Sequence, residues 1–134
     1  MIAAMNAIEV ISLFVEDLPA ARAFYFKAFA HEIIHEDNVC SILRIGNIVI
    51  NLLKIENAPT LVEPGKVAGP AAGARALYTV NVKDCDAVCR ELKALGVPLL
   101  NGPVDRPWGR RTAAFADPAG NVWEVAQELA ADGG

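Results

Sequence analysis

The sequence predicts an α+β fold built from two tandem βαβββ modules. Two stretches follow one pattern: VEDLPAARAFYFKAFAHEI from Val15, and VKDCDAVCRELKALGVPLL from Val82. Each follows an apolar strand and precedes three shorter extended segments. Between the copies, residues 56–74 are rich in proline, glycine and alanine, which is typical of a linker. We therefore expect modules at residues 1–55 and 75–134 within one compact domain.

An aspartate begins each of the two predicted helices. Asp17 and Asp84 stand where a strand ends, and each can accept hydrogen bonds from the free amides of a first helical turn. Pro19 suits the opening of the first helix, and Gly96 ends the second. The apolar residues at helical spacing, which indicate two helices, are Ala20, Phe24 and Ala28, then Val88, Leu92 and Leu95.

The predicted strands are short apolar runs. In the first copy they are IEVISLFV, EIIHE, VCSILRI and IVINLLKI, and in the second ALYTVNV, VPLLNG, RTAAFA and VWEVAQ. Within FADPAGNVWEV, Pro118 and Gly120 predict a hairpin turn. This turn places Glu124 in the middle of the last strand, where a carboxylate requires a partner, water or a ligand.

Composition excludes several classes of function. The chain has 134 residues, a net charge of −4 and no basic cluster, so we expect no binding to nucleic acid. We read no secretory signal and no membrane-spanning run, and we expect a cytoplasmic protein. Three cysteines argue against a disulfide framework. Cys85 and Cys89 are interpreted as small core residues, and Cys40 as buried in a strand.

The repeat resembles the vicinal oxygen chelate superfamily, through FVEDLPAARAFY, LKALGV and FADPAGNVWEV. This group includes glyoxalase I, extradiol dioxygenases, fosfomycin-resistance enzymes and bleomycin-resistance proteins. The resemblance covers nearly the whole chain. It implies curved mixed sheets that enclose a cavity, with the helices on the convex side. Strand alternation then directs Phe14, Asn51, Leu77 and Glu124 toward the cavity.

The metal positions of related enzymes are largely replaced in this chain. The resemblance places them at Val10, Asn51, Leu77 and Glu124. Val10 and Leu77 offer no donor atom, and Asn51 is a weak neutral ligand, so we expect no metal site and no cofactor. His31 and His35 are four residues apart. We expect a surface His31 and a His35 at the cavity mouth or strand edge rather than metal ligands.

The segment WGRR is similar to the bleomycin-resistance branch, whose members lack the metal and sequester drug. Trp108 offers a surface for stacking, and Arg111 a fork for a carboxylate or amide. Alternatively, Trp108 fills a module or dimer seam, and Arg111 pairs with Glu124 or Asp117. We expect metal-independent binding of a small, partly aromatic organic ligand. The candidate ligand-binding residues are Trp108, Arg110, Arg111, Glu124, Asn51, Phe14, Leu77 and His35.

Two other functions stay open. One is a glyoxalase-like lyase or isomerase, or a dioxygenase-related enzyme, with Glu124 as catalytic acid or base and Arg110 or Arg111 as electrostatic stabiliser. The other is a structural module that kept the fold and lost the site; a pocket closed by Leu53, Leu77 and Phe14 would favour it. The resemblance also implies a homodimer, because relatives pair modules across a two-fold axis.

Overall fold

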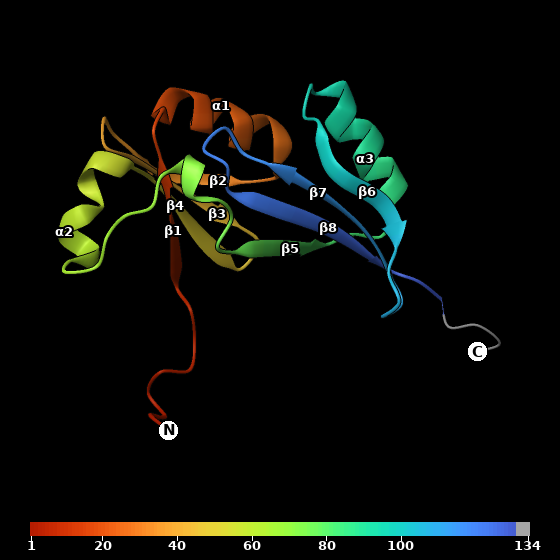
Figure 1. The fold of residues 1–134 in the computed structure, drawn as a ribbon, viewed down its shortest axis with the longest axis horizontal. Helices are drawn as coiled ribbons and strands as arrows, with labels where there is room; N and C mark the ends of the chain where they lie inside the picture. Colours follow the sequence, from red (N-terminus) through yellow and green to blue (C-terminus); the bar gives the residue numbers. More distant parts are fainter. Residues whose placement is uncertain (131–134) are drawn as a thin grey trace. The chain divides into compact units, whose positions relative to one another are not determined.

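The computed structural model describes residues 1–130 as two compact units, one spanning Met1–Ala68 and one beginning at Gly69. In each unit a strand, a helix and three further strands follow one another along the chain (Figure 1). The expected α+β fold with two βαβββ modules is confirmed.

The first unit is a four-stranded mixed sheet with a helix on one face. Its main elements are β1 (Val10–Val15), α1 (Leu18–Ala28), β2 (Glu32–Glu36), β3 (Cys40–Ile45) and β4 (Ile48–Lys54). The strand order is β1-β4-β3-β2, with β1 parallel to β4 and the other neighbours antiparallel. Buried side chains on alternate strand positions, among them Leu13, Leu43 and Leu52, form the core under α1.

The second unit repeats this arrangement. Its main elements are β5 (Leu77–Asn81), α3 (Cys85–Ala94), β6 (Leu99–Asp105), β7 (Arg110–Ala116) and β8 (Val122–Glu128). The strand order is β5-β8-β7-β6, and β5 is parallel to β8. Phe115, Trp123 and Val125 are buried on the face covered by α3. The side chain of Gln127 accepts a hydrogen bond from the Cys85 amide at 2.9 Å, which ties β8 to the start of α3.

The predicted helix caps are confirmed. Asp17 accepts a hydrogen bond from the Ala20 amide and Asp84 from the Ala87 amide, each at 3.0 Å. Gly96 follows α3 with a φ of +79°, a left-handed conformation that glycine adopts without steric cost.

The buried faces of the helices agree with the prediction in part. The buried helical residues are Leu18, Ala21, Phe24 and Tyr25 in α1, and Cys85, Cys89 and Leu92 in α3. Cys85 and Cys89 are buried as predicted; of the apolar residues at helical spacing, Phe24 and Leu92 are buried, and Leu95 is 41% exposed. Each helix has apolar residues on more than one side. The side that is buried is therefore set by how the helix packs on the sheet, not by the spacing of apolar residues alone.

Short helical turns lie in the predicted linker and at its start. They are the 3₁₀ turn η1 (Ile55–Asn57), the short helix α2 (Pro59–Val62) and the 3₁₀ turn η2 (Pro70–Ala72). No helix within residues 1–130 is long and apolar enough to cross a membrane.

Candidate functional site

Glu124 lies at the centre of the second sheet, on the face opposite α3. Its neighbours Trp123 and Val125 are buried on the helix side, so the alternation of β8 turns Glu124 the other way. Thr79 stands beside it in the parallel register of β5 and β8 and donates its hydroxyl hydrogen to Glu124 Oε1 at 3.0 Å. Leu77 shares this face and is 53% exposed. The carboxylate therefore has a neutral hydrogen-bond partner beside exposed apolar surface.

Arg111 lies on the opposite face, so its predicted pairing with Glu124 is wrong. The β7–β8 register places Arg111 beside Gln127 and Ala114 beside Glu124, and adjacent residues of a strand point to opposite faces. Arg111 Nε donates to Asp105 at 2.6 Å, and Nη1 donates to Asp86 at 3.0 Å. The guanidinium group of Arg111 therefore links β7 to Asp105 of β6 and to Asp86 of α3. It lies on the face of the sheet opposite Glu124.

The ion pair between Arg111 and Asp105 changes the titration of both groups. The hydrogen bond from Arg111 holds the pKa of the Asp105 carboxyl below its ordinary value. The same hydrogen bond and the charge of Asp105 raise the pKa of Arg111. Arg111 therefore remains a cation with two carboxylate partners.

The first sheet carries an equivalent polar pair. Ser12 and Asn51 are partners in the parallel register of β1 and β4, and Asn51 Nδ2 donates to Ser12 Oγ at 3.2 Å. Within residues 1–130, Asn51 Oδ1 is buried and has no hydrogen-bond partner. Phe14, two residues beyond Ser12, is half-buried on the same face, and Leu53 is buried there. In each unit, a hydroxyl on the first strand thus meets a hydrogen-bonding side chain on the last.

Trp108 lies in the turn between β6 and β7 and is 67% exposed. It borders a pocket of about 760 Å³, whose other lining residues are Asp105, Gly109, Arg110, Glu128, Leu129 and Ala130. Arg110 lies on the same face as Glu124, four positions along β7 from Ala114, the strand neighbour of Glu124. At about 3.3 Å per residue, Arg110 and Ala114 are about 13 Å apart along β7, and Trp108 lies before Arg110 in the turn.

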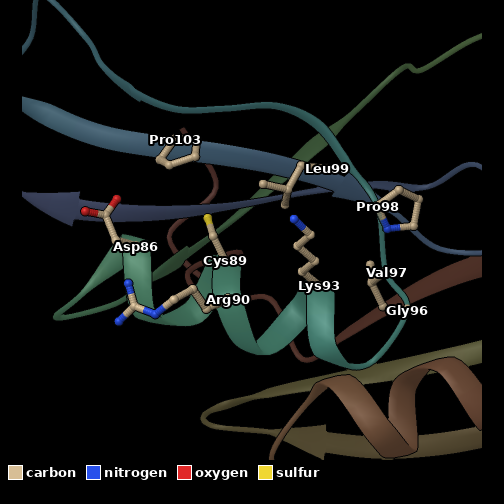
Figure 2. Close-up of a pocket in the computed structure, with 9 residues that line it drawn as sticks. All are labelled: Asp86, Cys89, Arg90, Lys93, Gly96, Val97, Pro98, Leu99 and Pro103. Atoms are coloured by element: carbon tan, nitrogen blue, oxygen red, sulfur yellow. The ribbon is translucent and has the colours of Figure 1, made fainter.

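A second pocket lies between α3 and β6, on the helix side of the second sheet (Figure 2). Its volume is about 840 Å³, and its lining residues are Asp86, Cys89, Arg90, Lys93, Gly96, Val97, Pro98, Leu99 and Pro103. Sequence reasoning missed this pocket, because it depends on how far β6 stands from α3. Cys89 borders it, and burial raises the pKa of the thiols of Cys89 and Cys85, the latter to about 12. Both cysteines are buried, as predicted, and both are protonated near neutrality.

The two histidines lie in different surroundings. His31 is half-buried, stacked on Phe26 with ring centroids 4.9 Å apart, so its predicted surface position is only partly correct. His35 is exposed on β2, an edge strand of the first sheet, and its Nε2 lies 2.8 Å from Asp37 Oδ2. Sequence reasoning missed Asp37 as a partner of His35. The sequence signal for this pair is that Asp37 follows His35 by two residues, directly after the end of β2.

Cys40 is half-buried at the start of β3, close to Asp37. Burial, together with the Asp37 charge and hydrogen bond, raises the pKa of the Cys40 thiol. Hydrogen bonds from His35 and from two backbone amides hold the pKa of the Asp37 carboxyl well below its usual range. These hydrogen bonds favour the ionised form of Asp37.

Similar folds occur in several solved structures. A glyoxalase/bleomycin resistance protein/dioxygenase from Nocardioides is 23% identical, with a TM-score of 0.80 over 96% of this chain and 86% of that one. A lactoylglutathione lyase from Agrobacterium tumefaciens is 24% identical, with a TM-score of 0.72 over 91% and 93%. TnmS3, an antibiotic binding protein from Streptomyces sp. CB03234, is 24% identical, with a TM-score of 0.70 over 93% and 98%. At these identities the likeness shows the fold alone.

The sequence itself carries the family assignment. No curated protein matches the chain. Residues 7–125, most of its length, match the family model described as the Glyoxalase/Bleomycin resistance protein/Dioxygenase superfamily. The chain belongs to the Glyoxalase/Bleomycin resistance protein/Dioxygenase superfamily.

Proposed function

We propose that this protein binds a small, partly aromatic organic molecule without a metal ion, and that its use is sequestration of the kind found in antibiotic resistance. The observation that carries this proposal is the Thr79–Glu124 pair. A carboxylate, held by one neutral hydroxyl, lies on a sheet face beside the exposed side chain of Leu77. An acid in such surroundings is suited to a ligand that brings hydrogen-bond donors and apolar surface together.

The donor set supports binding without a metal. The positions at which related enzymes hold the ion carry Val10, Asn51, Leu77 and Glu124. Val10 and Leu77 have hydrocarbon side chains without donor atoms and are 43% and 53% exposed. The side-chain amide of Asn51 already donates a hydrogen bond to Ser12. One carboxylate and one neutral amide do not satisfy zinc, which takes at least three protein ligands in catalytic sites.

The polar atoms indicate the chemistry of the ligand. Glu124 is an acceptor with a negative charge, and Asn51 Oδ1 is a buried acceptor without a partner within residues 1–130. Each feature, in its own unit, favours a group with N–H or O–H donors, and Glu124 favours one with a positive charge. The apolar residues on these faces, among them Phe14 and Leu77, favour a hydrocarbon or ring framework.

Trp108 supplies the aromatic part of the proposal. Its indole is largely exposed above a pocket that also contains Arg110. Planar rings stack on exposed indoles, and such pairs contribute about 0.5–1.5 kcal/mol beyond the burial of area. A ligand that contacts both Trp108 and Glu124 must extend along β7 from the turn toward Ala114, which lies about 13 Å from Arg110. A ligand that is shorter would use one of the two places.

The superfamily includes proteins with this kind of function. TnmS3 is an antibiotic binding protein of similar fold, although its low identity with this chain carries no residue-level assignment. The exposure of Leu77 also favours binding over a purely structural module, because a module without a site gains stability by covering such a side chain.

A homodimer is part of the proposal. The edge strands of both sheets present exposed apolar side chains: Ile33 and Ile34 on β2, and Leu100 and Val104 on β6. Edge strands with exposed apolar residues favour association with another chain.

Thermal unfolding with a panel of aromatic amines and planar cationic antibiotics tests the proposal. A ligand at about 100 times its Kd adds about 2.7 kcal/mol to the free energy of unfolding. We expect a hit to raise Tm equally with and without a chelator, and Glu124→Gln to reduce the shift. Glu91→Gln, which removes an exposed carboxylate of α3, is the matched control and keeps the shift. A shift that requires added metal, or that Glu124→Gln leaves unchanged, contradicts the proposal.

A further inference from the structure

The turn between β2 and β3 brings together three different metal-binding side chains. One ligand atom each from His35, Asp37 and Cys40 lies within 4.8 Å of the others. These residues belong to one hairpin of the first unit, and none of them occupies a position at which related enzymes hold a metal. An imidazole, a carboxylate and a thiol thus converge at the partly exposed end of a hairpin.

The backbone of this turn is held in place by its own side chains. Asp37 Oδ1 accepts hydrogen bonds from the amides of Val39 at 2.8 Å and Cys40 at 2.9 Å. The other oxygen, Oδ2, is thereby turned toward His35 Nε2 at 2.8 Å. Asp37 therefore orders the turn with one oxygen and presents the second at the surface.

Arg22 fixes both ends of the same turn from α1. Its Nη2 donates to the carbonyl oxygen of Cys40 at 3.1 Å and also to that of Asp37. Its Nε lies 3.5 Å from the carboxylate of Glu36, which offsets the charge of the guanidinium. The backbones of Asp37 and Cys40 are thus held by hydrogen bonds to Asp37 Oδ1 and from Arg22 to the two carbonyl oxygens, while Asp37 Oδ2 faces His35 and the Cys40 thiol lies beside Asp37.

We propose that His35, Asp37 and Cys40 form a zinc site that fastens the β2–β3 hairpin. Zinc takes nitrogen, oxygen and sulfur ligands at about 2.0–2.3 Å, which requires ligand atoms about 3.3–3.7 Å apart in a tetrahedron. Ligand atoms that already lie within 4.8 Å reach this spacing by small side-chain rotations. The thiolate and the carboxylate offset the charge of the ion, and a water completes the fourth position.

The position of the site explains what the ion contributes. β2 is an edge strand whose residues are all exposed, and its pairing with β3 shifts register between Ile33 and His35. A strand with so little burial depends on its ladder and on its turn. Zinc would join His35 of β2 to Cys40 of β3 directly, adding a cross-link where packing contributes little.

Cobalt binding to the reduced protein tests the site, because Co²⁺ takes the same ligands and is coloured. We expect one equivalent of Co²⁺ to give a thiolate-to-metal charge-transfer band and tetrahedral ligand-field bands, and Zn²⁺ to displace them. Cys40→Ser removes the charge-transfer band, and His35→Ala weakens binding by at least about tenfold. His35 is exposed, so this variant is expected to fold.

Matched controls separate this site from the other cysteines and histidine. Cys89→Ala and His31→Ala should keep the bands, as should Glu124→Gln, which is outside the site. The wild-type protein failing to develop a charge-transfer band overturns the proposal. So does a band that persists in Cys40→Ser, or one that disappears in folded Cys89→Ala.

Discussion

Thr79 donates its hydroxyl hydrogen to Glu124 at 3.0 Å across the parallel pair of β5 and β8. Ser12 and Asn51 hold the corresponding register in the first unit, where an amide stands in place of the acid. The repeat thus places the acid Glu124 in the second sheet and the neutral amide Asn51 in the first at equivalent positions of the last strand.

Thr79→Val should lower the free energy of unfolding by about 1 kcal/mol, because it removes the hydrogen bond to a half-buried carboxylate while keeping the β-branched shape. Chemical denaturation measures the difference. Thr60→Val removes an exposed hydroxyl and serves as the control, with an expected change below about 0.5 kcal/mol. Equal effects of the two substitutions would show that the Thr79–Glu124 bond does not stabilise the fold.

Asn51→Leu should raise the free energy of unfolding by about 1 kcal/mol, because it removes a buried oxygen without a partner from an apolar face. The same substitution should reduce ligand-induced thermal shifts. Asn47→Leu, in the exposed turn between β3 and β4, is a control in which neither quantity changes much. A loss of stability in Asn51→Leu would indicate that a water or a bound group satisfies Asn51 in solution.

Trp108→Phe should shift the fluorescence emission of the protein to shorter wavelength, because the remaining indole, Trp123, is 5% exposed and Trp108 is 67% exposed. A ligand that stacks on Trp108 should quench wild-type emission and leave the emission of Trp108→Phe largely unchanged. Equal quenching of both proteins by a bound ligand would exclude Trp108 as the stacking surface.

Arg111→Gln should raise the pKa of Asp105 toward its ordinary value of 3.8. Since the pKa of Asp105 is lowered in the folded state, the ion pair stabilises the fold above the ordinary value, and this stabilisation is lost as pH falls through the lowered pKa. NMR titration of the Asp105 carboxyl measures the change. Arg110→Gln, on the other face of β7, should leave that titration where it is.

Sedimentation should give a dimer for the wild-type protein at micromolar concentration. Leu100→Asp, which places a charge on the exposed edge strand β6, should shift it toward monomer. Leu95→Asp alters an exposed leucine outside the edge strands and is the matched control. A wild-type monomer at this concentration would contradict the proposed homodimer.

Most strands were predictable because each combines an apolar run with turn residues at its ends. β2 and β8 begin where the sequence predicted, but β6 runs from Leu99 to Asp105 rather than through VPLLNG. Gly102 and Pro103 would usually end a strand, yet here they lie within one. Gly102 has a φ of +83°, and a Cβ there would lie 2.3 Å from the carbonyl oxygen of Thr112. Such an irregular strand depends on contact with its neighbour, which a linear pattern does not show.

The candidate site was predictable only in part. Strand alternation correctly turned Glu124 away from the helix, because that inference needs a single strand. The partner of Glu124 was not predictable, because it depends on the register between β5 and β8 and between β7 and β8. The charge of Arg111 alone suggested it as a partner of Glu124. The cluster of His35, Asp37 and Cys40 likewise appears only when the hairpin is closed.

The ion pairs of Arg111 make the β6 edge of the second sheet sensitive to ionic strength. β6 departs from regular pairing with β7 at two places, and Arg111 joins Asp105 of β6 to β7 and α3. The Debye length falls to about 3 Å at 1 M salt, so concentrated salt weakens partly exposed ion pairs of this kind, while backbone ladders are little affected. Concentrated salt would therefore weaken the attachment of β6 before that of the central strands β7 and β8. The edge strand β6 would be the first part of this region to separate from the sheet.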